Sequence, residues 1–503
     1  MGSTRPGGPD QALAADAARR VRSTFAGIGV CCRLAHRTER RTKRIDTLMQ
    51  ATLDRPLRVA VVGAGPAGIY AADILARSDT PVSVDILERL PAPYGLIRYG
   101  VAPDHPRIKQ IVQALQRVLE RPAIRLLGNV DYGTDLKLDD LRQHYDAAIF
   151  ATGADKDRSL SVPGVDLPGS FGAAEFVSWY DGHPEAPREW PLTARSVAVI
   201  GAGNVALDVA RVLARTADEL LTTEIPDNVY RGLAASQVTD VHVFGRRGPA
   251  QAKFTPLELR ELDHSPNVEV LVDPADIEFD QASLDAINGS NQVRTVVKTL
   301  QDWAIRDPGT RPRRLHLHFL HGPAGILGAE CVTGLRTERM ELDGSGGVRG
   351  TGRFHDWPVQ AVYRAVGYLS SHLADLPFDH DSGTVPHDAG RVLGLDGQQV
   401  PGVYATGWIK RGPVGLIGHT KGDALETIGS LLADIPALRP APEPDPAAIR
   451  ELLARRGVEF TTLEGWNRLN QHEITLGQQR GRERIKVVPR EEMLAVSRGT
   501  AES

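Results

Sequence analysis

The chain has 503 residues, of which 41% are hydrophobic and 24% are charged, as in an ordinary globular protein of two or three domains. The formal net charge of −4 argues against a general nucleic-acid-binding protein, and no apolar run is long enough to cross a membrane. The three cysteines (Cys31, Cys32 and Cys331) form no CxxC pair, which argues against a disulfide-framed secreted protein and a dithiol redox centre and leaves no ligand set for an iron–sulfur cluster. We therefore predict a cytoplasmic protein with no metal site, in which any redox chemistry would come from a bound organic cofactor.

Residues 1–55 are rich in arginine and have no clear hydrophobic periodicity. They contain no apolar core of the kind that a secretory signal needs. A mitochondrial presequence is poor in acidic residues, whereas acidic residues such as Asp10, Asp16, Glu39 and Asp46 interrupt this segment. We interpret the segment as a disordered extension, or as translated sequence upstream of a start at Met49.

A strand, a glycine turn, a helix and a second strand follow in order. The apolar, β-branched run 57–63 predicts a buried parallel strand, 69–77 a helix and 82–88 the next strand. This order predicts a βαβ unit with the sequence GAGPAG at its first turn.

The glycines of this turn, Gly63, Gly65 and Gly68, have the GxGxxG spacing of a dinucleotide-binding loop. The first permits a tight turn, the second lets the main chain approach a pyrophosphate, and the third lets helix and strand pack closely. Glu88 ends the second strand, where a carboxylate can accept hydrogen bonds from ribose hydroxyls. The motif predicts one dinucleotide site.

A second unit starts at Ser196, with the glycine turn GAGNVA, a helix over 207–216 and a later strand that ends in GRRGP. Gly201, Gly203 and Ala206 give the GxGxxA variant of the turn. Arg246 and Arg247 stand where the first unit has an acid, and paired guanidiniums favour a 2′-phosphate. We therefore predict NADP(H) here and FAD at the first turn.

These motifs resemble ferredoxin–NADP reductases of the adrenodoxin-reductase type. The resemblance runs from about residue 57 to residue 494, and its longest matching strings are VVGAGPAGIYAADIL, PYGLIRYGVAPDHP, IGAGNVALDVARVL, FGRRGPAQAKFTPLELREL and GWIKRGPVGLIGHTKGDA. It implies two doubly wound, Rossmann-like α/β domains, with the NADPH domain inserted into the FAD domain. We expect FAD-domain segments at 56–155 and 368–503, and the NADP-binding domain at 156–367.

The same resemblance assigns roles to individual residues. For FAD it implies Gly63, Gly65, Ala67, Gly68, Glu88, Leu96, Val130, Trp408, Gly415, Leu416 and Ile417. For NADP(H) it implies Arg158, Gly201, Gly203, Asn204, Val205, Ala206, Arg246, Arg247, Glu258 and Gly415. Polar side chains near the reacting rings, with a catalytic effect, would be His105, Asp208 and Glu261.

The implied reaction is hydride transfer from NADPH to FAD, followed by single-electron transfer to an acidic iron–sulfur ferredoxin. Lys253 and Arg260 are the main candidates for a basic docking surface, and Arg98 and Lys109 are weaker ones. The family implies a monomer. Two alternatives share the motifs, namely an NADPH oxidase or quinone reductase and a non-catalytic NADPH-binding redox sensor; without CxxC, a disulfide reductase is excluded.

Overall fold

The computed structural model describes residues 55–415 and 417–500. Residues 1–54, which include the predicted extension, Cys31, Cys32 and Met49, lie outside this description, as do Leu416 and the side chain of Ile417.

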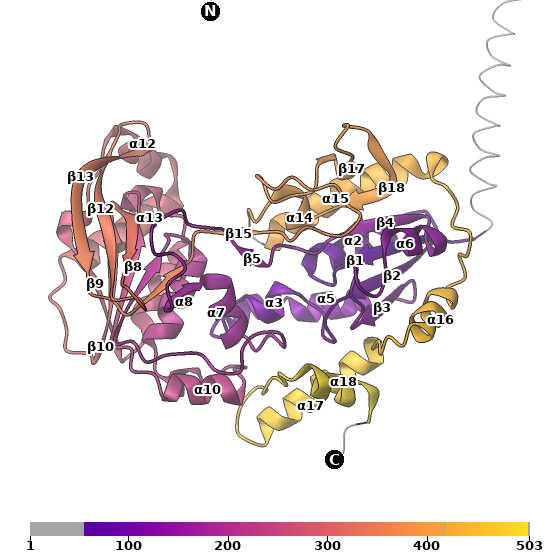
Figure 1. The fold of residues 1–503 in the computed structure, drawn as a ribbon, viewed down its shortest axis with the longest axis horizontal. Coiled ribbons are helices and arrows are strands. Elements are labelled where there is room, and N and C mark those ends of the chain that lie inside the picture. Colours follow the sequence, from indigo (N-terminus) through magenta and orange to yellow (C-terminus); the bar gives the residue numbers. More distant parts are fainter. Residues whose placement is uncertain (1–54, 416, 501–503) are drawn as a thin grey trace, which may run out of the picture. The chain divides into compact units, whose positions relative to one another are not determined.

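The first sheet has seven strands and is built from both ends of the described chain (Figure 1). Its order is β16 (His387–Asp388), β17 (Arg391–Leu393), β18 (Gln399–Ala405), β4 (Ala147–Phe150), β1 (Leu57–Val62), β2 (Val82–Glu88) and β3 (Ile124–Gly128). The strands from β18 to β3 are parallel, and β16 and β17 are antiparallel additions at one edge. The buried run of β1 lies at the centre, as its uninterrupted apolar sequence predicts.

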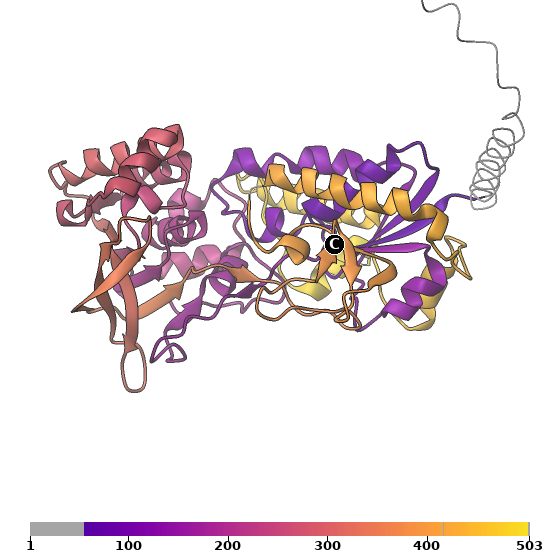
Figure 2. The ribbon, with the colours of Figure 1, turned by 90° about the horizontal axis from the view of Figure 1, so that it is seen from above.

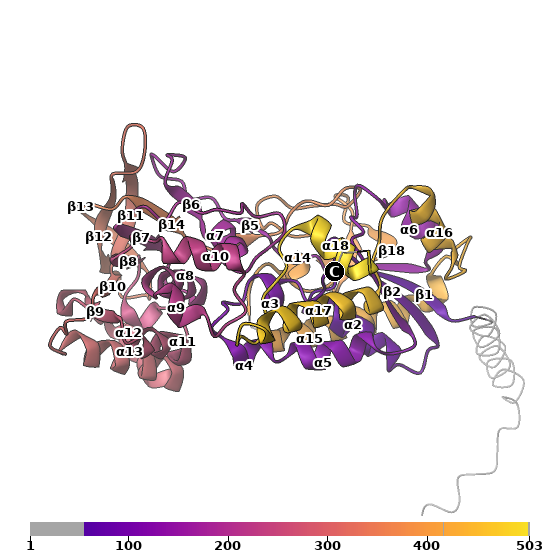
Figure 3. The ribbon, with the colours of Figure 1, turned by 90° about the horizontal axis from the view of Figure 1, so that it is seen from below.

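Helices cover the faces of the first sheet. The helix α2 (Pro66–Ala76) packs against α15 (Ile417–Asp434), the long orange helix of Figure 2. The two lie over a core of residues from β1, β2 and β4. Near the carboxyl end of the chain, α17 (Leu463–Gln478) packs against α18 (Arg490–Arg498), as Figure 3 shows in yellow.

The second sheet has six strands, all parallel, in the order β6 (Ser170–Gly172), β14 (Ala361–Arg364), β7 (Ser196–Ile200), β8 (Asp240–Gly245), β10 (Arg313–Phe319) and β9 (Val268–Val272). The helix α8 (Asn204–Ala214) follows β7, and almost all of its residues are buried. A separate antiparallel sheet follows β10 and consists of β11 (His321–Leu327), β12 (Gly334–Leu342) and β13 (Val348–Trp357).

The chain crosses between the two large sheets through a short antiparallel pair of β5 (Lys156–Asp157) and β15 (Tyr368–Leu369). All strands of the second sheet therefore lie between these two crossing segments in the sequence. The predicted domain boundaries at 155/156 and 367/368 fall next to this pair.

The remaining described helices, most of which are short, connect or cover these sheets. They are α3 (Leu96–Tyr99), α4 (Pro106–Lys109), α5 (Val112–Leu119), α6 (Leu138–His144), α7 (Ala173–Tyr180), α9 (Ala217–Leu220), α10 (Asp227–Ala234), α11 (Pro256–Glu261), α12 (Gln281–Gly289), α13 (Asn291–Ala304), α14 (Trp408–Arg411) and α16 (Ala448–Arg455). Single 3₁₀ turns occur at Pro249–Gln251, Leu262–His264, Pro274–Asp276 and Ile435–Ala437.

Predicted element positions agree with the structure except at their ends. Both nucleotide-turn helices begin three residues earlier than expected, at Pro66 and Asn204, because they start directly at the glycine turns. A helix that starts inside the turn points its free N–H groups at the loop, which is the arrangement that phosphate binding needs.

Candidate active site: two nucleotide turns and a buried ion cluster

The first glycine turn joins β1 to α2 and opens on a pocket of about 500 Å³, a volume usual for a cofactor site. Gly63 adopts φ +108°, a conformation that side chains rarely take. A Cβ on Gly68 would lie 2.0 Å from the Gly63 carbonyl oxygen, whereas one on Gly65 would meet nothing within 4 Å. The three glycines thus have the three roles that the motif predicts: the turn, the approach of a ligand and the close packing of the helix.

The pocket is lined by residues of distant segments. Of the residues predicted for FAD, those that line it are Gly63, Gly65, Ala67, Glu88, Leu96, Val130, Trp408 and Gly415. Gly68 packs behind the turn and does not line it. Most of the lining is apolar, with few polar groups, as in sites that hold a large planar cofactor. The residues present therefore fit a dinucleotide with a flavin ring.

Glu88, at the end of β2, lines this pocket. Its carboxylate accepts hydrogen bonds from the Ala64 N–H at 2.8 Å and the Leu90 N–H at 3.0 Å. Burial raises its pKa, although those two bonds oppose the effect. The two bonds fix the carboxylate and leave further lone pairs, so it can accept from ribose hydroxyls.

The second glycine turn joins β7 to α8. Gly201 adopts φ +149°, and a Cβ on it would lie 2.3 Å from the Ala365 carbonyl oxygen. Gly203 faces open space, as Gly65 does in the first turn. The Asn204 carboxamide oxygen accepts from the Thr255 N–H at 3.0 Å, which ties the start of α8 to the loop before α11. Val205, one residue on, lines the same pocket as the first turn.

Arg246 and Arg247 follow β8, on the loop predicted to bind a 2′-phosphate. The first is exposed and the second is half-buried. Within the described part of the chain, neither guanidinium has a hydrogen-bond or ion-pair partner. Arg158 is also exposed, and its backbone N–H donates to the Gly367 carbonyl at 2.9 Å, between the two crossing segments. These cations are therefore available to an anionic ligand.

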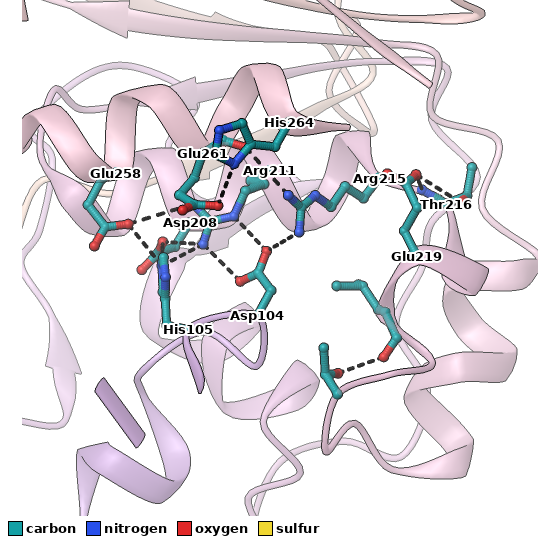
Figure 4. Close-up of polar contacts among 12 residues, drawn as sticks. Asp104, His105, Asp208, Arg211, Arg215, Thr216, Glu219, Glu258, Glu261 and His264 are labelled. Atoms are coloured by element: carbon teal, nitrogen blue, oxygen red, sulfur yellow. Dashed lines mark hydrogen bonds and ion pairs between the residues drawn. The ribbon is translucent and has the colours of Figure 1, made fainter. Parts of the chain in front are cut away.

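A buried ion cluster lies where α4 meets α8 and α11 (Figure 4). His105 Nε2 is 2.9 Å from Asp208 Oδ1 and 2.9 Å from Glu258 Oε2. Arg211 donates to Asp208 Oδ1 at 2.7 Å and forms two bonds with Asp104, at 2.7 and 2.9 Å. The Arg211 Nη2 atom is 2.6 Å from His105 Nε2, so a guanidinium already occupies the position that a metal cation would take.

The charges of this cluster determine the protonation of His105. Burial alone would lower its pKa, but hydrogen bonds to Asp208 and Glu258 outweigh burial and raise the pKa to about 9. The raised pKa favours the protonated ring, whose Nε2–H can donate to Asp208 or Glu258. His105 and Asp208 do not line the pocket themselves; Tyr99, Val101 and Val205, which are close to them in sequence, do.

Comparison with known proteins identifies the family. The model of the pyridine nucleotide-disulphide oxidoreductase family matches residues 57–243. NADPH-ferredoxin reductase FprA of Mycobacterium tuberculosis is 39% identical over 88% of this chain and 100% of its own length. NADPH:adrenodoxin oxidoreductase of Arabidopsis thaliana is 37% identical over 88% of this chain and 96% of its own. The chain belongs to the NADPH-ferredoxin reductase family.

The solved structure of Mycobacterium tuberculosis FprA in complex with NADPH agrees with the fold, with a TM-score of 0.82 at 38% identity over 88% of this chain and 100% of that one. The predicted family, the α/β fold class and the assignment to the oxidoreductases are confirmed. No helix in the described part of the chain combines the length and apolar character needed to cross a membrane.

The structure separates two acidic residues of α11 to which the ferredoxin reductase resemblance gives different roles. Glu258, predicted as an NADP(H) contact, contacts His105. Glu261, predicted as catalytic, pairs with His264 at 3.2 Å. Its backbone carbonyl accepts from Arg215 at 3.4 Å, at the edge of the cluster.

Sequence reasoning missed the cations and the second aspartate of the cluster. Arg211 is one helical turn after Asp208 on α8, a spacing that signals an ion pair on one helix face. Asp104 contacts Arg211 and also Arg215 at 2.6 Å, and only the folded chain brings them together. The pKa of Asp104 lies below its usual range, because these guanidiniums outweigh its burial.

Two weaker docking candidates are wrong. Arg98 is buried and forms two hydrogen bonds with Glu473, at 3.0 and 2.5 Å. Lys109 pairs with Glu224 at 2.7 Å and is largely buried. Neither side chain is available to a partner, because a buried ion pair does not open without a large cost.

Proposed function

We propose that this chain is an FAD-containing NADPH:ferredoxin oxidoreductase. One observation carries the proposal: a single pocket is lined by the first glycine turn and also by Val205, in the second turn. A ligand held at each turn would place its ring end near the other. The functions of two relatives, NADPH-ferredoxin reductase FprA and NADPH:adrenodoxin oxidoreductase, support the same assignment.

The first sheet would hold FAD, with segments 56–155 and 368–503 as one domain. Gly63 and Gly65 bring main-chain N–H groups to the pyrophosphate, and Glu88 accepts from the ribose. Leu96, Val130, Trp408 and Gly415 would surround the ring system, and Leu416 and Ile417 remain predicted contacts. When bound, FAD supplies the redox chemistry, since it accepts a hydride equivalent from NADPH and donates electrons singly.

The segment 156–367 would bind NADPH as an inserted domain. Gly201 and Gly203 allow its pyrophosphate to approach the start of α8, where Asn204, Val205 and Ala206 lie. Arg246 and Arg247 would bind the 2′-phosphate with forked donors, and Arg158 would contact the nucleotide. Because both turns border one pocket, the nicotinamide would be oriented toward the flavin site.

His105 would act from the side of this pocket. With its raised pKa and its contacts to Asp208 and Glu258, it would keep a positive charge behind the pocket-lining residues Val101 and Val205, which are close to the cluster in sequence. Such a fixed charge favours the step in which negative charge develops nearby. Glu261 would have only an indirect effect, through the helix α11 that it shares with Glu258.

An acidic ferredoxin would dock at α11. Lys253 and Arg260 are exposed, and Leu257 between them is 49% exposed. Basic groups around an exposed apolar side chain suit a transient, charge-steered complex. We also propose a monomer, as the ferredoxin reductase resemblance implies. A cytoplasmic location is proposed because the cysteine usage suits a reducing compartment.

The test is anaerobic mixing of the yellow holoprotein with NADPH, followed by oxidised ferredoxin. We expect NADPH to bleach the flavin band rapidly and NADH to bleach it only slightly. Added ferredoxin should then re-oxidise the reduced flavin. A colourless protein that takes up no flavin would contradict the proposal. Fast bleaching followed by re-oxidation with quinone or oxygen but not ferredoxin would favour the oxidase or quinone reductase, and slow bleaching would favour the redox sensor.

A further inference from the structure

Three histidines gather on one face of the second sheet, outside the site described above. His242 on β8 is the register partner of His316 on β10, and His318 lies two residues further along β10. Since side chains alternate along a strand, His316 and His318 point to the same face, and His242 joins them from the neighbouring strand. The topology of the sheet thus brings together three imidazoles that are far apart in the sequence.

The ring nitrogens are close enough to share one ion. His242 Nδ1 and His318 Nε2 are 3.1 Å apart, and one nitrogen of each ring lies within 4.8 Å of the other two. The rings of His242 and His316 stack with centroids 4.3 Å apart. A tetrahedral zinc site, with Zn–N bonds of about 2.0–2.1 Å, needs nitrogens about 3.3–3.4 Å apart and ring planes that converge on the ion. The three rings are nearly parallel, with interplanar angles of 8°, 13° and 4°, so they would have to turn about their side-chain torsions to bind one ion together.

Carboxylates lie against the outer nitrogens of two of these rings. His316 Nε2 is 3.4 Å from Asp240 Oδ1, and His318 Nδ1 is 3.7 Å from Asp276 Oδ2. An N–H directed at a carboxylate leaves the other ring nitrogen as a lone-pair donor, which is the usual outer arrangement of a metal-binding histidine. The carboxylates are themselves held, Asp240 by Arg314 at 2.6 Å and Asp276 by Arg339 at 2.5 Å.

The surroundings suit metal binding. Phe244 and Trp357 border the rings, with centroids 4.8 and 4.4 Å from that of His318, and all three histidines are only partly exposed. Imidazoles in an apolar shell are good ligands for late transition metals.

We propose that His242, His316 and His318 bind one divalent late transition-metal ion, for which Zn²⁺ is the appropriate probe. The ion replaces the hydrogen bond between His242 and His318, and a water completes four-coordination. The sequence predicts no metal site because its cysteine spacing offers none. These ligands instead come from the alternation HLH in β10 and from one residue of β8.

The experiment is titration of the untagged, chelator-treated holoprotein with ZnCl₂, followed by calorimetry and by metal analysis after gel filtration. We expect a site of one ion per chain that is present in the wild type and weakened at least about tenfold in His242→Gln and in His318→Gln. Zinc should also raise the Tm of the wild type, because it binds the folded state, and should raise it less in the variants.

The matched control is His355→Gln. His355 packs on Trp357, with ring centroids 4.3 Å apart, but is exposed and outside the triad. It should bind zinc as the wild type does. Equal zinc affinity in all four proteins would overturn the proposal, and so would the absence of a site in the wild type. The flavin spectrum and the metal-free Tm show whether each variant is folded, and Asp276→Asn, which changes no ligand, should weaken zinc binding less than His318→Gln.

Discussion

The two glycine turns are alike in backbone and differ in what surrounds them. At the first, the acidic residue at the strand end is fixed by two backbone N–H groups at the edge of a largely apolar pocket. At the second, the corresponding position carries two arginines without a partner among the described residues. A largely apolar pocket suits a resident cofactor, and exposed guanidiniums suit a coenzyme that binds and leaves. We therefore expect the same loop to serve two kinds of ligand exchange.

The most severe test of this comparison is Gly68→Ala. The new Cβ would lie 2.0 Å from the Gly63 carbonyl oxygen, so the turn must move. We expect the purified protein to lose most of its flavin and about 1–3 kcal/mol of stability. Flavin content per chain is the measurement. Gly289→Ala is the control, since its Cβ meets nothing within 4 Å, and full flavin content in Gly68→Ala would contradict the packing argument.

The arginines of the second turn can be tested by coenzyme preference. Arg247→Ala removes a charged donor worth about 1.5–3 kcal/mol, which corresponds to a rise in the KM for NADPH of roughly 10- to 150-fold. The KM for NADH should stay the same, because NADH has no 2′-phosphate. Arg246→Ala should likewise raise the KM for NADPH and leave the KM for NADH unchanged. An equal rise in both constants would mean that these residues support the loop and do not read the phosphate.

Removal of the His105 imidazole tests the role of the buried ion cluster at α4, α8 and α11. We expect His105→Gln to slow flavin reduction by NADPH about tenfold without loss of flavin. In the wild type the rate of flavin reduction should change as the pH rises through about 9, where His105 loses its proton. This pH dependence should be absent in the variant. Stopped-flow reduction between pH 6 and 10 gives both readouts, and an identical pH profile in the variant would remove His105 from the mechanism.

The raised pKa of His105 also predicts a pH-dependent contribution to the free energy of unfolding. The pKa of His105 is raised in the folded state, so its contribution is fully present below the unfolded value of about 6.5 and is lost as pH rises through about 9. The stability difference between wild type and His105→Gln in urea should therefore shrink between pH 6 and pH 10. A constant difference would show that the cluster stabilises the fold only by packing.

The smallest expected effect concerns the docking surface. Arg260→Glu should lower the kcat/KM for ferredoxin several-fold at low salt and less at high salt, while NADPH-to-ferricyanide turnover stays unchanged. The control is Lys137→Glu, which reverses the charge of an exposed residue just before α6, outside the proposed docking surface. If both substitutions lowered the kcat/KM for ferredoxin equally, the cause would be the change in net charge and not the loss of a docking surface at α11.

The nucleotide turns could be predicted from the sequence because their signals are local. Gly63, Gly65 and Glu88 lie within one βαβ unit, and their spacing is set by the turn itself. The ion cluster could not be predicted in full, since Asp104 reaches Arg211 only when separate segments fold together. Glu258 and Glu261 lie three residues apart on one helix. The packing of α11 in the folded chain determines that Glu258 contacts His105, and this packing cannot be read from the sequence.

The first sheet needs strands from both ends of the chain, which has a consequence for biosynthesis. The strand β18 pairs with β4, but about 250 residues separate them. At the usual rates of translation, roughly 10–50 s pass between the emergence of the two. The second sheet is complete by Arg364 and can fold while the ribosome is still at work. Incorporation of the flavin must therefore be one of the last events in the maturation of a nascent molecule.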